Sequence, residues 1–172
     1  IVNTDEILDL EKISVNEDNL SLVEGQSIKD IFVDSGKSVA IGKIDGAAPT
    51  EEAPLTIDIN LGEVARNNTS MEMEQVVIKV PETVTNTEAG VPSKGSVTYV
   101  DANGVSNTVY FDEDKNDVQV LRATNEATAR ISNTGDIVID LGGQVAVKQI
   151  SINVTGNRGN KNISEIAKIE FL

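Results

Sequence analysis

The stretch DIVIDLGGQV, at residues 136–145, opens the pattern that decides the fold of this chain. Apolar and polar residues alternate through its first half and a Gly-Gly pair follows, which is typical of a half-buried β-strand that ends at a turn. A second apolar run, at residues 145–154, follows directly. The pattern therefore predicts two consecutive strands joined at glycines.

The same unit occurs a second time in the chain. LTIDINLGEV, at residues 55–64, matches DIVIDLGGQV and leads into its own apolar run at 73–80, after an additional polar loop at 65–70. A period of roughly eighty residues is compatible with two tandem domains, but a unit of that length buries little core by itself. We therefore favour two equivalent strand pairs within a single sandwich over two tandem domains.

Turns and further strands surround these units. The tetrapeptide DANG, at residues 101–104, predicts a hairpin turn because Asn and Gly tolerate the backbone angles that such turns need. Helical signal is confined to residues 4–10 and 27–32, with Ser27 as an N-cap. Further strands are predicted at residues 96–100, 105–111 and 166–171. The prediction is an all-β fold, an antiparallel β-sandwich.

Composition excludes several classes of function. The chain has 172 residues, 28 acidic against 14 basic, and a net charge of −14. Such a surface repels phosphate backbones and anionic lipid, which argues against nucleic-acid and membrane partners. It has no Cys and no His, so a Ser-His-Asp triad, a thiolate nucleophile and a zinc–thiolate site are excluded. We expect no enzyme activity, and we interpret Asp58 and Asp140, at equivalent positions of the two copies, as polar strand residues.

The cellular location is predicted from the same composition. No apolar run is long enough to span a bilayer, and the first residues lack the charged and apolar regions of a signal peptide. A cysteine-free, acidic chain rich in Thr, Asn, Val and Ile is typical of surface proteins that Gram-positive bacteria export. We therefore expect a mature domain excised from a longer extracellular or cell-wall-attached protein.

Several motifs resemble those of discoidin-type domains, the C-terminal domains of coagulation factors 5 and 8. IVIDLG at 137–142 and VKQISI at 147–152 are similar to two consecutive strands of that family, and the first copy of the unit fits equally well. Residues 154–171 are similar to its closing loop and final strand. The resemblance covers residues 27–172 and implies a jelly-roll sandwich of the galactose-binding type, with residues 1–26 as an N-terminal extension packing on it or leading into it.

The resemblance also implies a function. In bacteria, such modules accompany larger secreted enzymes or adhesins, where they bind glycans or act as spacers. We expect a non-catalytic module of a larger secreted or cell-surface protein that binds carbohydrate or another surface ligand. The alternative is a structural spacer or adhesin-stalk domain without a small-molecule ligand. The small number of aromatic residues, five in all, favours this alternative. Stalk domains can carry a Lys–Asn cross-link at a buried lysine. We expect Lys79 and Lys148 to be buried, so either is a candidate for such a cross-link.

Two loops supply candidate ligand-binding residues. NRGNKN, at residues 157–162, offers amide and guanidinium donors of the kind that bind sugar hydroxyls, although a simple surface turn has the same composition. RNNTS, at residues 66–70, is the equivalent loop of the first copy. The candidate ligand-binding residues are Asn67, Asn68, Asn157, Arg158, Asn160 and Asn162.

Calcium is the one ion that the resemblance suggests. Family members with structural calcium use a glutamate near the final strand, a position that falls on Lys168 without gaps or on Glu165 after a shift of register. The Asp-Gly-Asp loop of the family is matched loosely by residues 30–36. The candidate metal residues are Asp30, Asp34 and Glu165, and no other cofactor is expected. DEDKND, at residues 112–117, begins like an EF-hand loop but lacks its glycine, so we interpret it as a solvated turn.

Overall fold

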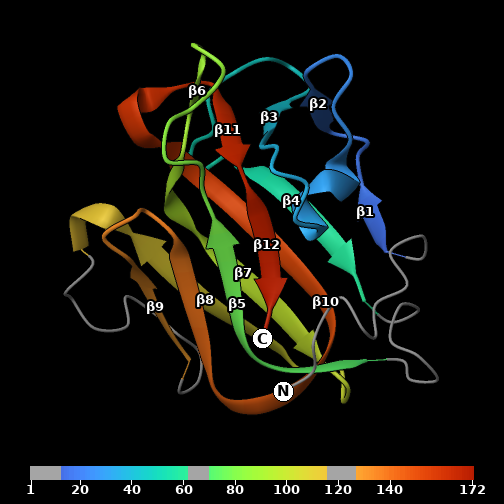
Figure 1. Cartoon of the computed structure of the whole chain (residues 1–172). Helices are drawn as coiled ribbons and strands as arrows, with labels where there is room; N and C mark the ends of the chain where they lie inside the picture. Colours follow the sequence, from blue (N-terminus) through green and yellow to red (C-terminus); the bar gives the residue numbers. More distant parts are fainter. Residues whose placement is uncertain (1–12, 62–69, 116–126) are drawn as a thin grey trace.

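The chain folds into an eight-stranded and a four-stranded β-sheet in a computed structural model that describes residues 13–61, 70–115 and 127–172 (Figure 1). The larger sheet contains β1 (Ser14–Asn16), β4 (Leu55–Asn60), β5 (Met71–Lys79), β7 (Pro92–Asp101), β8 (Ser106–Asp112), β9 (Thr128–Ile131), β10 (Ile137–Asn157) and β12 (Lys168–Phe171). The smaller sheet contains β2 (Leu20–Leu22), β3 (Val39–Lys43), β6 (Ala89–Gly90) and β11 (Ile163–Ile166). Three short 3₁₀-helices are η2 (Ile28–Phe32), η3 (Glu113–Lys115) and η4 (Arg158–Asn160). The predicted all-β, antiparallel sandwich is confirmed.

Strand β10 connects the two layers of the larger sheet. Its first half lies between β9 and β5, and its second half lies between β4 and β7. Between the halves, Gly142 and Gly143 have φ angles of 81° and 147°, which residues other than glycine rarely adopt. The register with β5 shifts at the same place, between Asp140 and Val145. The glycine pair therefore lets one long strand turn back and pass from one layer to the other (Figure 1).

The two copies of the repeated unit exchange strands across these layers. Strand β4 of the first copy pairs with the second half of β10, where Ile57 lies opposite Ile152. Strand β5 of the first copy pairs with the first half of β10, where Ile78 lies opposite Ile137. Each layer therefore contains one strand from each copy, and the copies share one hydrogen-bonded sheet.

The core consists almost entirely of aliphatic side chains. In β4, Leu55, Ile57 and Ile59 are buried and alternate with partly exposed or exposed polar residues, as the sequence pattern predicts. One cluster of buried residues takes in both layers and the smaller sheet. Phe32 of η2 stacks on Phe171 of β12, with ring centroids 6.2 Å apart, and so joins η2 to the C-terminal strand.

The predicted hairpin turn at residues 101–104 and the predicted N-cap at Ser27 are confirmed. The Ser27 hydroxyl accepts a hydrogen bond from the Lys29 amide and caps η2, a 3₁₀-helix. In the hairpin between β7 and β8, the Asp101 carboxylate accepts from the amides of Asn103 and Val105. The helical segment predicted at residues 4–10 lies outside the described residues.

The smaller sheet was not predicted. Strands β1 and β2, within the predicted N-terminal extension, hydrogen-bond to β4 and β3 respectively. The strand predicted at residues 166–171 is divided at Ala167 into β11 and β12, which belong to different sheets. The apolar pattern does not show this division, because Ile166, Ile169 and Phe171 are all buried in the same core. Within the described residues, no helix has the length and apolar character needed to cross a membrane.

Candidate functional site

One end of the sandwich gathers polar loops, and we call it the loop end. It comprises residues 80–88, the turn at 132–136, η3, and the loop at 157–162. The Val80 amide donates to Asp136 over 3.0 Å, which joins the first two segments. The Lys161 ammonium donates to the Thr87 carbonyl over 3.2 Å, which joins the first and last. The C-terminal strand β12 runs away from this end (Figure 1).

Asn157 closes the base of the predicted ligand-binding loop. Its side chain is buried, with only 4% of the residue exposed. The amide donates to the Lys161 carbonyl over 3.0 Å, and its oxygen accepts from the Ser164 hydroxyl over 2.6 Å. Both ends of the amide are thus occupied inside the protein. Asn157 therefore fixes the shape of the loop, and the residues at 158–162 that follow it are exposed.

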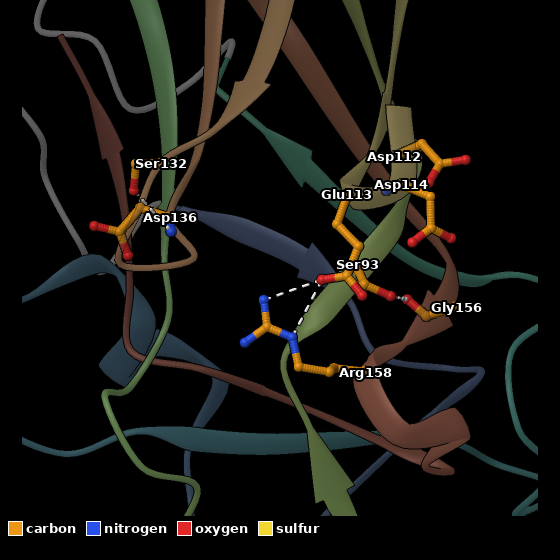
Figure 2. Close-up of polar contacts among 8 residues, drawn as sticks. All are labelled: Ser93, Asp112, Glu113, Asp114, Ser132, Asp136, Gly156 and Arg158. Carbon is orange, nitrogen blue, oxygen red and sulfur yellow. Dashed lines mark hydrogen bonds and ion pairs between the residues drawn. The ribbon is translucent and has the colours of Figure 1, made fainter. Parts of the chain in front are cut away.

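Arg158 lies on the exposed part of the loop and is paired with Glu113 of η3. The guanidinium donates from Nε and Nη2 to one Glu113 oxygen, over 3.1 and 3.0 Å (Figure 2). Close to the pair in the view of Figure 2, Ser93 donates to the Gly156 carbonyl over 3.3 Å. The side chains of Arg158 and Glu113 are 56% and 28% exposed, so the ion pair is solvated. It joins the loop to η3, and more than half of the Arg158 side chain stays exposed to solvent.

The other predicted ligand residues are exposed or lie outside the described chain. Asn160 is exposed and has a φ of 54°, in the left-handed region that Asn tolerates. Asn162 is exposed, and its amide donates to the Gly46 carbonyl over 3.3 Å. The structure therefore brings together Arg158, Asn160 and Asn162 on one loop, whereas Asn67 and Asn68 fall outside the described residues.

A pocket of about 800 Å³ opens beside the loop end. One wall is formed by η2 and the segment at residues 33–38, and the other by residues 81–85. Lys79 of β5 and Lys168 of β12 lie between the walls. Asp30 and Asp34, predicted as metal ligands, are both in its lining, together with hydroxyl and lysine side chains. The pocket is therefore polar and of mixed charge.

Glu165, the third predicted metal residue, is fully buried behind this pocket. Its carboxylate accepts from the Ser38 hydroxyl over 2.7 Å and from the Thr85 amide over 2.9 Å at each oxygen. The Thr85 hydroxyl and the Asn86 amide each donate over 3.1 Å. Burial raises the pKa of the Glu165 carboxyl, but these hydrogen bonds outweigh it and hold the pKa below its ordinary value. Because Ser38 and Thr85 line opposite walls, Glu165 ties the two walls together.

This arrangement does not fit a calcium ion. The oxygens of Glu165 are occupied by protein donors, and Asp34 lies 3.1 Å from the Lys168 ammonium. Calcium needs six to eight oxygen ligands, several of them carboxylates. No group of three or more acidic residues that could hold a metal ion occurs in residues 13–61, 70–115 and 127–172. Lys168 is the residue that the ungapped comparison places at the family's calcium-ligating glutamate. Its ammonium, and not a calcium ion, is the positive charge beside Asp34.

The equivalent carboxylates of the repeat lie apart. Asp58 projects from β4 between buried Ile57 and Ile59, and it accepts from the Ser151 hydroxyl. Asp140 projects from the first half of β10, in the other layer, and accepts from the Gly142 amide. Both point away from the core, so they lie on opposite outer faces and do not form an acid/base pair.

Comparisons with solved structures identify the fold. The family 32 carbohydrate-binding module of Clostridium perfringens NanJ, solved with galactose, matches with a TM-score of 0.56 and 15% identity over 95% of both chains. The paired modules CBM32-1 and CBM32-2 of ZmpB from the same organism match with TM-scores of 0.56 at 10% identity, and at 9% identity in the complex with GalNAc. The chain spans 34% and 35% of those longer structures.

The chain has the discoidin or galactose-binding-like fold of these modules, as its motifs predicted. No protein-family model matches the sequence. No curated protein matches it either. Identities of 9–15% show a shared fold, and the ligand has to be argued from the residues of this chain.

Proposed function

We propose that this chain is a non-catalytic carbohydrate-binding module of a larger secreted or cell-surface bacterial protein. The observation that carries the proposal is the fold, which is that of modules solved with galactose and with GalNAc. The loop end adds polar donors on a rigid β-scaffold, the arrangement in which sandwich proteins commonly place their ligand contacts. The absence of His and Cys from the sequence is consistent with a binding role.

The proposed contacts are the exposed side chains of the loop at 157–162. The guanidinium of Arg158 and the amides of Asn160 and Asn162 supply directional donors to sugar hydroxyls. Asn67 and Asn68 remain proposed contacts from the sequence alone. Buried Asn157 takes the supporting role, because its amide fixes the backbone from which Arg158 and Asn160 project.

A glycan array tests this proposal, followed by calorimetric titration of each glycan that binds. We expect Arg158→Gln to weaken binding about tenfold, the effect of one lost charge-assisted hydrogen bond. Arg130→Gln, which removes an exposed arginine from β9, is the matched control and should leave affinity unchanged. Absence of binding to every glycan on the array would contradict the proposal, whereas binding insensitive to Arg158→Gln would move the site elsewhere.

A spacer or adhesin-stalk domain is the second candidate, and the aromatic residues favour it. Four of the five rings, those of Phe32, Tyr99, Phe111 and Phe171, are buried, which leaves Tyr110 at 36% exposure. Sugar-binding sites often stack a ring on the sugar, and a spacer has no such need. An array without binding, together with unfolding at high force in single-molecule pulling, would favour the spacer.

A cross-link at Lys79 is not supported. The side chain of Lys79 is 46% exposed and its ammonium lies 3.1 Å from Glu170, so the expectation that it is buried is wrong. Lys148 is only partly exposed. An intact mass lower than the calculated mass by one ammonia would reveal a Lys–Asn bond at either residue.

A further inference from the structure

Two lysines lie side by side in the pocket. Lys79 of β5 and Lys168 of β12 are directly opposite each other in the antiparallel register, and both line the pocket. Like charges directly opposite each other on neighbouring strands destabilise a sheet. In a chain with half as many basic as acidic residues, the pairing concentrates positive charge at one place. The two ammonium groups therefore need negative partners.

Their partners differ in how firmly they are held. The Glu170 carboxylate, on a side chain 18% exposed, lies 3.1 Å from Lys79 and 3.9 Å from Lys168. Its hydrogen bond and charge raise the pKa of Lys79 above the ordinary value. The closer partner of Lys168 is Asp34, at 3.1 Å. The Lys168 side chain is only 12% exposed, whereas that of Asp34 is 84% exposed on the segment between η2 and β3.

The pair formed by Lys168 and Asp34 is thus a nearly buried ammonium with an exposed carboxylate. Exposed carboxylates gain little free energy from such pairs, because water solvates them almost as well. The ammonium gains more, because few water molecules reach it. A carboxylate from outside the protein is therefore able to take the place of Asp34 at small cost.

We propose that this pocket binds the carboxylate of an acidic sugar, which replaces Asp34 at Lys168 and also contacts Lys79. The proposal rests on the carbohydrate-binding function and adds to it a second site with its own ligand class. A volume of about 800 Å³ has room for a uronic or sialic acid residue and part of its neighbour. Ser35 and Thr83 in the lining add hydroxyl groups that are able to hydrogen-bond to a sugar.

The acidic character of the whole chain limits this affinity without preventing binding. Asp30 and Glu82 also line the pocket, and the net charge is −14. At physiological ionic strength, exposed charges are screened beyond about 8 Å, so the charges within the pocket affect a bound carboxylate more than the distant part of the net charge does. The expected binding is salt-dependent and of modest affinity.

Calorimetry with four probes tests the proposal: methyl glucuronide and N-acetylneuraminic acid as acidic sugars, methyl galactoside and GalNAc as neutral ones. Lys79→Gln should weaken acidic sugars about tenfold, through loss of one charge-assisted contact. Asp34→Asn should strengthen acidic sugars several-fold, because it removes the internal competitor, and should leave neutral sugars unchanged. Glu82→Gln is the matched control, since it removes a negative charge from the same pocket but no partner of Lys168.

The possible outcomes distinguish the pocket site from the proposed function. Acidic sugars that bind, with opposite effects of Lys79→Gln and Asp34→Asn, support the pocket site. Binding of neutral sugars alone overturns the pocket site and leaves the proposed function standing. Acidic sugars that bind but respond equally to Asp34→Asn and Glu82→Gln also overturn it, because the gain is then unspecific electrostatics. Loss of binding to all four probes and to the whole glycan array overturns both proposals.

Discussion

Replacing Glu165 by glutamine tests the claim that this buried carboxylate, without a metal ion, holds the pocket walls together. In the wild-type chain, the carboxylate accepts hydrogen bonds from Ser38 on one wall and from Thr85 and Asn86 on the other. Glutamine keeps one oxygen acceptor and replaces the other oxygen by a donor, which faces the Ser38 hydroxyl and the Thr85 amide. The remaining bonds become neutral.

The expected loss follows from the number of bonds that weaken. A hydrogen bond to a charged group contributes about 1.5–3 kcal/mol and a neutral one about 1 kcal/mol. Each of the three bonds to the remaining oxygen, from the Thr85 amide, the Thr85 hydroxyl and the Asn86 amide, therefore loses about 1 kcal/mol. Relief of the desolvation cost of the charge returns part of this. We expect Glu165→Gln to lower the free energy of unfolding by about 2 kcal/mol at pH 7.

The pH dependence identifies the carboxylate as the cause. The pKa of Glu165 is lower in the folded than in the unfolded chain, so its stabilisation is fully present above the unfolded value, about 4.3, and declines as the pH falls through the folded value. The difference between wild type and Glu165→Gln should therefore narrow between pH 7 and pH 3. Urea unfolding followed by circular dichroism measures it at both pH values.

Glu88→Gln is the matched control, because Glu88 is an exposed glutamate in the same segment. It should change the free energy of unfolding by less than about 0.5 kcal/mol. A similarly small effect of Glu165→Gln at pH 7, or an effect that is the same at pH 3, would show that the Glu165 carboxylate does not hold the walls together.

Three further predictions follow from other features. Chelation with EDTA should leave the melting temperature and glycan affinity unchanged, because Glu165 and Asp34 are occupied by protein groups; a drop of several degrees that added calcium restores would contradict this. Gly95→Ala should lower the free energy of unfolding by about 1–3 kcal/mol or more, since the added methyl would overlap the Asn153 carbonyl and press on Phe111. Unfolding by urea measures this loss. Gly104→Ser, in the open hairpin turn, is strained only by its φ of 82° and should cost less. Asn157→Ala should lower stability by about 1–3 kcal/mol through the unpaired Ser164 hydroxyl and Lys161 carbonyl, and should weaken glycan binding by freeing the loop; unchanged unfolding would show that the amide is dispensable.

The repeated strand unit made the sandwich predictable from sequence. The alternation in LTIDIN and IVIDLG identifies which face of β4 and of the first half of β10 is buried, and the glycines after it mark the turn. The motif could not show that the Gly142–Gly143 turn lies within one continuous strand, because a bend and a strand end have the same local composition. Strand β3 was missed because VAIGK is buried on both faces and shows no alternation.

The candidate site was predictable only where its residues are adjacent in sequence. Arg158, Asn160 and Asn162 form one polar loop, and the composition of that loop suffices to single them out. The contacts that give the site its character join distant residues: Arg158 with Glu113, Lys168 with Asp34, and Glu165 with Ser38. No local pattern indicates such pairs. The sequence shows only that Glu165 is a carboxylate near the final strand, which is why it was predicted to be a metal ligand. Its donors, among them Ser38 and Thr85, come from distant segments and make it a structural link between the pocket walls.

The most direct test of the carbohydrate-binding proposal is to map the binding site by two-dimensional amide NMR during titration with the strongest glycan from the array. We expect chemical-shift changes to concentrate at the loop end, in residues 80–88, 132–136 and 157–162, and for acidic glycans also in the pocket segment at 33–38. Shifts confined to the opposite end, around the hairpin at residues 101–104, or no saturable shift with any glycan, would contradict it.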